Sequence, residues 1–134
     1  MIRRFAHDPS EIPEARKMVR AQLEAWGLPA EQAPLELAVS ELVTNAIVHG
    51  WGLIDVSMSF DDGCIRLEVA DEGLAGPAGW PEPRAGRPPN GVGGWGLSLV
   101  EHLSDAWGHS LDGGTTRVWM ERRAGAHSLP ARPL

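Results

Sequence analysis

Three polar residues at helical spacing carry most of the chemistry in this sequence. Glu41, Asn45 and His49 are four positions apart, so they follow one ridge of a helix beside its apolar stripe. The Asn45 amide oxygen can bind a hard cation, and the Glu41 carboxylate can orient or deprotonate a hydroxyl group. The pair therefore indicates a site that activates a hydroxyl next to a metal ion. The alternative is a solvated helix face, with His49 favoured at the helix end by the helix dipole.

A second candidate site is the segment Asp71-Glu72-Gly73, which follows a predicted strand. An aspartate at a strand end can accept a hydrogen bond from an amino group of a flat ligand. The glycine two residues later lets that ligand approach the backbone. An ordinary turn that begins with Asp71 is the alternative.

Glycines precede a predicted helix in the segment 91–97, which reads GVGGWGL. Glycines at a helix start expose backbone N–H groups and the positive end of the helix dipole, and both attract phosphate. The segment therefore indicates a phosphate-binding loop. A flexible linker before the helix is the alternative.

Hydrophobic periodicity predicts the elements that must position these residues. Apolar residues at three- and four-residue spacing indicate helices, and strict alternation indicates strands. The expected helices cover residues 10–26, 31–49 and 97–107. The expected strands are a short edge strand at the N-terminus and the segments 53–60, 64–70, 109–111 and 115–122, joined as hairpins at 61–63 and 112–114.

These elements predict an α/β fold of the α+β type, a two-layer sandwich with helices packed on one face of a mixed, mainly antiparallel sheet. One domain is expected over residues 1–123, followed by a flexible C-terminal tail at 124–134. Residues 73–96 hold eight of the 16 glycines and five of the 11 prolines, which predicts a long loop. Loops of this length in compact domains are usually functional lids or disordered segments.

Composition and charge exclude several other classes of protein. The net charge of −6 opposes direct binding to nucleic acid. The single cysteine, Cys64, cannot form an intrachain disulfide or a cysteine-cluster metal site. The apolar runs are too short for a membrane span or a signal peptide, so we expect a cytoplasmic protein with no membrane partner.

Taken in order along the chain, the candidate segments resemble the boxes of the GHKL superfamily of ATPases. The matching segments are 41–49 (ELVTNAIVH), 71–73 (DEG), 94–97 (GWGL) and 113–115 (GGT). Within that superfamily, the phrases ELVTNAIVHG and GWGLSLVEHL look most like the anti-sigma-factor serine/threonine kinases of bacteria. The resemblance covers most of the chain and implies the Bergerat-type ATP-binding fold, with residues 73–96 as a lid over the nucleotide.

This resemblance implies a role for each matching residue. Glu41 would be the general base that activates a serine hydroxyl or water, and Asn45 would bind Mg²⁺ at the phosphates. Asp71 would bind the exocyclic amine of adenine, with Gly73 giving clearance and Thr115 completing the pocket. The full set of ATP- and Mg²⁺-binding residues that it implies is Asn45, His49, Asp71, Gly73, Gly91, Gly93, Gly94, Trp95, Gly96, Leu97 and Thr115.

Two positions depart from the GHKL pattern. Trp95 stands where many relatives have a basic residue, and Ala75 replaces a glycine of the box that begins at Asp71. Either the domain lacks a cation at the phosphates, or Arg84 or Arg87 of the lid supplies it. The lid is also rich in proline, so ATP binding could persist while catalysis is slow or lost.

The resemblance implies a regulatory protein that binds ATP and Mg²⁺, phosphorylates a serine of an antagonist protein and sequesters a sigma factor. It also suggests a homodimer. The departures leave a second function open, a nucleotide-dependent protein-binding module with weak or no catalysis. The catalytic domain of a sensor histidine kinase and a domain that binds no nucleotide are the remaining alternatives.

Overall fold

The computed structural model describes residues 1–73 and 97–125. Its helices are α1 (Ile12–Ala25), α2 (Gln32–His49) and α3 (Ser98–Leu103), with the short 3-10 helices η1 (Pro9–Glu11) and η2 (Pro29–Glu31) before α1 and α2. Its strands are β1 (Ile2–Phe5), β2 (Ile54–Asp61), β3 (Cys64–Asp71), β4 (Ala106–Asp112) and β5 (Thr115–Arg123). The predicted edge strand, the first two helices and both hairpins are therefore confirmed. None of the helices in the described ranges combines the length and the apolar character that a membrane span requires.

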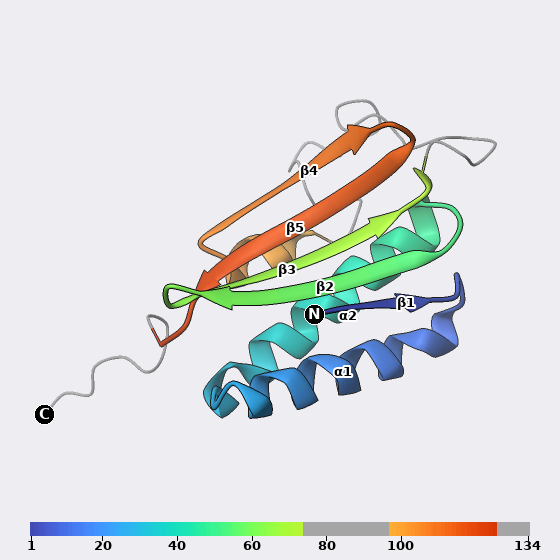
Figure 1. The fold of residues 1–134 in the computed structure, drawn as a ribbon. Coiled ribbons are helices and arrows are strands. Elements are labelled where there is room, and N and C mark those ends of the chain that lie inside the picture. Colours follow the sequence, from blue (N-terminus) through green and yellow to red (C-terminus); the bar gives the residue numbers. More distant parts are fainter. Residues whose placement is uncertain (74–96, 126–134) are drawn as a thin grey trace, which may run out of the picture.

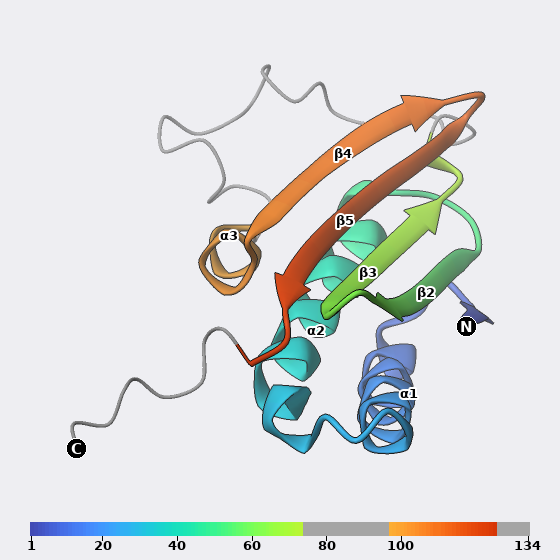
Figure 2. The same cartoon turned by 60° about the vertical axis from the view of Figure 1, so that its left-hand side comes forward.

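The five strands form one sheet in the order β1-β2-β3-β5-β4. The helices α1, α2 and α3 cover one face of this sheet and leave the other face open (Figure 1 and Figure 2). The predicted two-layer sandwich is thus confirmed. The sheet, expected to be mixed and mainly antiparallel, has only antiparallel pairings among the described strands.

Alternating apolar residues fix which face of each strand meets the helices. In β2, buried Ile54, Val56 and Met58 alternate with more exposed residues, and β3 and β5 repeat this pattern. Full burial of a large apolar side chain stabilises the fold by about 1.5–3 kcal/mol. A slip of one residue would turn the whole set toward solvent, so burial specifies the strand register. The residues that α2 buries are Leu35, Ala38, Val39, Leu42, Val43, Asn45 and Ala46.

The predicted third helix, 97–107, is wrong at its C-terminal end. α3 has only six residues, and Trp107 lies in β4, where it pairs with Met120 of β5. The pairing begins where the backbone N–H of Asp105 donates to the carbonyl of Glu121 (2.8 Å). Hydrogen bonding to β5 therefore overrides the helical periodicity of this segment, and β4 begins three residues earlier than the predicted strand at 109–111.

A buried ion pair joins the end of β5 to the connection between α1 and α2. Arg122 Nε donates to Glu31 Oε1 (2.6 Å), and both side chains are more than nine-tenths buried. Arg122 Nη1 also donates to the carbonyl of Leu103 (2.7 Å), and Glu31 Oε2 accepts from the backbone N–H of Gly125 (3.1 Å). The first residues of the predicted tail at 124–134 are thus bound to the domain, and those from 126 onward lie outside the described residues.

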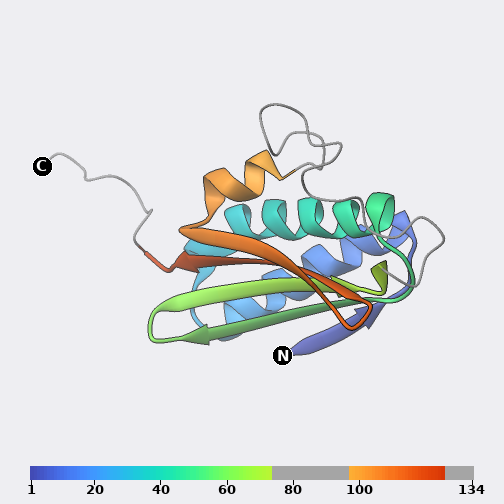
Figure 3. The same ribbon diagram turned by 90° about the horizontal axis from the view of Figure 1, so that it is seen from above.

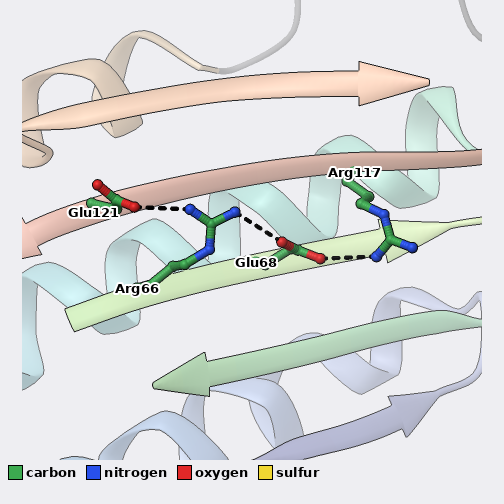
Figure 4. Close-up of polar contacts among 4 residues, drawn as sticks. All are labelled: Arg66, Glu68, Arg117 and Glu121. Atoms are coloured by element: carbon green, nitrogen blue, oxygen red, sulfur yellow. Dashed lines mark hydrogen bonds and ion pairs between the residues drawn. The ribbon is translucent and has the colours of Figure 1, made fainter. Parts of the chain in front are cut away.

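The open face of the sheet carries a row of alternating charges. Figure 4 shows Glu121, Arg66, Glu68 and Arg117 in order across β3 and β5, with N–O distances of 2.9, 3.1 and 3.0 Å. Arg66 also lies over the ring of Trp119, 4.6 Å from its centroid. Solvent-exposed ion pairs contribute about 0–1 kcal/mol each. This row of charges therefore adds little to the stability of the fold.

Candidate functional site

The second half of α2 carries the first candidate residues. Glu41, Asn45 and His49 follow one ridge of the helix, but burial separates them. Asn45 is 2% exposed, whereas Glu41 and His49 are half-buried. Asn45 therefore belongs to the buried side of the helix, next to Leu42 and Ala46, and a solvated helix face does not describe it. Glu41 stays accessible from solvent one turn away.

The Asn45 amide is buried without the hydrogen bonds that such a group normally makes. Neither Oδ1 nor Nδ2 has a partner among the described residues. An unpaired buried polar group costs about 1–3 kcal/mol, and in native proteins these groups are usually satisfied by protein, ligand or ordered water. The Asn45 side chain is therefore suited to bind a metal ion or a polar ligand.

Asp71 ends β3, and this end of the strand lies at the same end of the molecule as the C-terminus of α2 (Figure 1 and Figure 3). Asp71 is 4% exposed and lies directly against Gly50, the residue that follows α2. A Cβ at position 50 would collide with the Asp71 carboxylate. Glycine at this position therefore allows α2 and β3 to bring their candidate residues together.

Burial raises the pKa of Asp71 to about 6, because the carboxylate loses hydration. Backbone hydrogen bonds from Trp51 and Gly73 and the positive charge of His7 oppose this rise. One carboxyl oxygen, Oδ1, has no hydrogen-bond partner among the described residues. At neutral pH the Asp71 side chain is therefore mostly ionised and can accept a hydrogen bond from a ligand.

The threonine next to Asp71 is Thr116, which the sequence motifs did not single out. Thr116 pairs with Asp71 across β3 and β5, is 1% exposed, and its Oγ1 has no partner within the described ranges. The predicted Thr115 lies on the other face of β5 and lines a hollow that Asp71 and Glu72 also border. The alternation of β5, in which Val118 faces the core, was the signal that could have found Thr116.

The backbone of Gly73 packs closely against the two unpaired oxygens. A Cβ at this position would collide with Thr116 Oγ1 and would lie 3.0 Å from Asp71 Oδ1. Both oxygens therefore border the space in which a side chain at position 73 would lie. This arrangement suits a flat ligand that offers an amino group and a second polar atom at its edge.

Several predicted site residues lie outside the described ranges. These are Gly91, Gly93, Gly94, Trp95 and Gly96, together with the segment 74–90 of the predicted lid. Leu97 is fully buried in the core and immediately precedes α3. Its side chain packs in the interior, so a ligand at this position would contact its backbone N–H.

A comparison with protein families accounts for nearly the whole described part of the chain. Residues 5–122 match the family described as the histidine kinase-like ATPase domain. This chain belongs to that family. Membership of this family assigns ATP binding to the domain that residues 5–122 form. The matched range includes α2, the end of β3 and most of β5, and so includes Asn45, Asp71 and Thr116.

Curated relatives of this ATPase domain include the anti-sigma F factors of two Geobacillus species. The chain is 32% identical over 87 residues to the protein of Geobacillus stearothermophilus. It is 34% identical over 84 residues to the protein of Geobacillus thermodenitrificans. Each match covers 56% of this chain and 57% of the relative, so the chain spans little more than half the length of these relatives.

A solved structure of the RsbU and RsbW domains of a Mycobacterium tuberculosis protein is similar to the ATPase domain. The TM-score is 0.65, and the match covers 100% of this chain and 34% of that chain. Because the two sequences are 22% identical, the likeness shows that the fold is shared.

Proposed function

We propose that this ATPase domain binds ATP with Mg²⁺, phosphorylates a serine of a partner protein and acts as an anti-sigma factor. One observation carries the proposal. Asn45, Asp71 and Thr116 hold buried polar atoms without partners among the described residues, and all three belong to the matched ATPase domain. Each unpaired group costs free energy of folding, and these three belong to α2, β3 and β5, whereas the fourth, Ser104 Oγ, follows α3.

Asp71 would recognise adenine. Its Oδ1 would accept a hydrogen bond from the exocyclic amino group, Thr116 Oγ1 would donate to a ring nitrogen, and Gly73 would give the ring room. We assign this role to Thr116 in place of Thr115, because Thr116 is buried on the face of β5 that meets the helices. A site built to bond an amino group rejects nucleotides that lack it.

Asn45 fits the role of a Mg²⁺ ligand. Mg²⁺ usually keeps several waters and is bound by one or two side chains plus phosphate oxygens, so one buried amide oxygen is a sufficient contribution. The bound ion would neutralise charge on the phosphates. The phosphates would also meet the backbone N–H groups of the segment 91–97, and His49 would support the end of α2. These phosphate contacts remain a prediction from the sequence.

Glu41 would be the general base. It lies one turn before Asn45, and no ion pair engages its carboxylate among the described residues, whereas Glu31 and Glu36 are bound by arginines. Glu41 would take the proton of the serine hydroxyl while the serine oxygen bonds to the γ-phosphorus and the bond to ADP breaks. Positioning and charge stabilisation would supply most of the rate.

The protein partners are proposed from the relatives. Those relatives are named anti-sigma F factors, so this domain would bind a sigma factor and the antagonist protein that it phosphorylates. Both events would occur in the cytoplasm, with the domain as a homodimer. The net charge of −6 favours protein partners over direct nucleic-acid binding.

Transfer of labelled phosphate from ATP to the antagonist protein tests this proposal. We expect Glu41→Ala to lower the transfer rate at least about 100-fold, because general-base catalysis contributes roughly 10²–10⁴-fold. ATP affinity should change less than about threefold, since the carboxylate is not a nucleotide ligand. Asp61→Ala removes an exposed carboxylate at the far end of β2 and serves as the matched control.

Two outcomes would contradict parts of this scheme. Transfer that survives Glu41→Ala at the wild-type rate removes Glu41 from the role of base. A wild-type protein that binds ATP, and binds its partner more tightly with ATP, but transfers no phosphate is a nucleotide-dependent binding module and not a kinase.

A further inference from the structure

His7 uses both of its ring nitrogens to contact backbone carbonyl oxygens. Nδ1 lies 3.0 Å from the carbonyl oxygen of Gly52, and Nε2 lies 2.9 Å from that of Ile47. A carbonyl oxygen only accepts hydrogen bonds, and a neutral imidazole carries a single N–H. Both contacts are hydrogen bonds only when His7 is the doubly protonated imidazolium.

The turn between β1 and η1 holds the His7 ring in this position. The backbone N–H of Ala6 donates to Glu11 Oε2 (3.0 Å), and the Asp8 N–H donates to the Ala6 carbonyl (2.9 Å). Asp8 Oδ1 then accepts from the backbone N–H of Ser10 (2.9 Å). Hydrogen bonds on both sides of His7 therefore fix the backbone from which the ring extends.

The two carbonyl groups belong to segments next to the ATP site. Ile47 lies in the last turn of α2, where carbonyl groups lack donors within the helix and attract positive charge. Gly52 lies in the loop 50–53, which joins α2 to β2. His7 therefore fastens the end of the helix that carries Asn45 to the loop that follows it.

The loop 50–53 in turn supports Asp71. Gly50 lies against the Asp71 carboxylate, and the backbone N–H of Trp51 donates to it. The Trp51 carbonyl accepts from the backbone N–H of Glu72 (2.7 Å), so the loop is also tied to the end of β3. A shift of this loop would move the Asp71 carboxylate.

Charged groups of several segments surround His7. They are Arg3 and Arg4 of β1, Asp8 and Glu11 in its own turn, His49 at the end of α2, Asp55 of β2, and Asp71 and Glu72 at the end of β3. Arg4 is already paired with Asp55. The charge of His7 acts on Asp71, whose pKa it lowers.

We infer that His7, as an imidazolium, is a positioning residue for adenine recognition. It clamps the loop 50–53 to α2 and so holds the Asp71 carboxylate ionised and aimed at the adenine amino group. The inference rests on the proposed ATP site. His7 acts through Asp71, which would bind the exocyclic amino group of adenine. Removal of His7 should therefore weaken the binding of a nucleotide that carries this amino group and leave unchanged the binding of a nucleotide that lacks it.

The ¹⁵N NMR spectrum of the His7 ring at pH 7 tests the charge state, using the wild-type chain without nucleotide. The His7→Gln variant assigns the signals by their loss. We expect protons on both Nδ1 and Nε2. A neutral ring with one protonated nitrogen would overturn the inference.

Binding of ATP and of inosine triphosphate, each with Mg²⁺, tests the role of His7 in recognition. Inosine triphosphate lacks the exocyclic amino group. We expect His7→Gln to weaken ATP binding about tenfold and inosine triphosphate binding less than about twofold, because only ATP carries the amino group that Asp71 would bind. The loss of ATP affinity at acid pH should also move to higher pH in this variant. His102→Gln changes an exposed histidine of α3 and is the control.

The two nucleotides separate the failure of this inference from the failure of the ATP site. Equal losses for both nucleotides would make His7 a residue of general stability and would overturn the inference while the ATP site stands. A wild-type protein that binds neither nucleotide at millimolar concentration would overturn the proposed function itself.

Discussion

Asn45, Asp71 and Thr116 are polar side chains on surfaces that are otherwise apolar. Their neighbours on α2 and on the inner face of β3 and β5 are leucines, valines and alanines, as the core requires. Asp71 illustrates the cost, since burial raises the pKa of its carboxyl group to about 6. A residue that is unfavourable for the fold and well placed for a ligand is typical of a binding site.

The Asp71→Asn variant should separate stability from binding. The folded-state pKa of about 6 lies above the ordinary value of 3.8, so the fold binds this proton more tightly than the unfolded chain does. The stability that comes from this proton is full below about pH 4 and is lost as the pH rises through 6. The amide of the variant does not titrate, so only the wild type loses this stability. The difference in melting temperature, variant minus wild type, should therefore rise between pH 4 and pH 6 and stay constant above pH 6.

ATP affinity should change in the opposite sense in the same variant. Loss of a hydrogen bond to a charged group costs about 1.5–3 kcal/mol, so we expect binding at pH 7 to weaken about tenfold or more. Thermal unfolding at several pH values and calorimetry with ATP measure the two effects. A variant that is less stable than wild type at pH 7, with unchanged ATP affinity, would contradict this account of Asp71.

At the scale of elements, hydrophobic periodicity predicted the helices and strands that the local sequence determines. The apolar faces of 31–49 and of the first hairpin were sufficient to place Asn45 on a helix and Asp71 at a strand end. Trp107 was assigned to a helix because the helical periodicity of 97–107 continued through it, whereas it pairs with Met120 in the hairpin of β4 and β5. Thr115 was chosen from its place in a motif, although the alternation of β5 turns Thr116 inward. His7 gave no sequence signal, because its partners are backbone carbonyls at least 40 residues away.

The ion pair of Arg122 and Glu31 should be the polar contact on which these elements depend most. Removal of one partner of a buried pair costs about 3–5 kcal/mol, because the other charge stays buried. We therefore expect Arg122→Met to lower the free energy of unfolding in urea by this amount. Arg117→Met, which breaks the exposed pair with Glu68, should cost about 0–1 kcal/mol. Equal costs for the two variants would show that the buried pair has no special role.

At the scale of the whole molecule, the residues that stabilise the two-layer sandwich differ from those that form the candidate binding site. The helices lie on one side of the sheet (Figure 3), and the apolar core lies between them and its inner face. The unpaired polar groups of Asn45, Asp71 and Thr116 belong to α2, β3 and β5. The N-terminal turn at His7, the loop 50–53 and the strand pair β3 and β5 meet around Asp71. Three distant parts of the chain thus build one site, which explains why motifs identified its residues one by one but not its geometry.

Calorimetric titration with Mg²⁺ and ATP tests the central claim most directly, using wild type, Thr116→Val and Thr115→Val. The account predicts saturable binding to wild type. Affinity should fall about two- to tenfold in Thr116→Val, since a hydrogen bond is worth about 0.5–1.5 kcal/mol, and should be unchanged in Thr115→Val. No heat with wild type at millimolar ATP, or an equal loss in both variants, would contradict an adenine site between β3 and β5 on the helical face of the sheet.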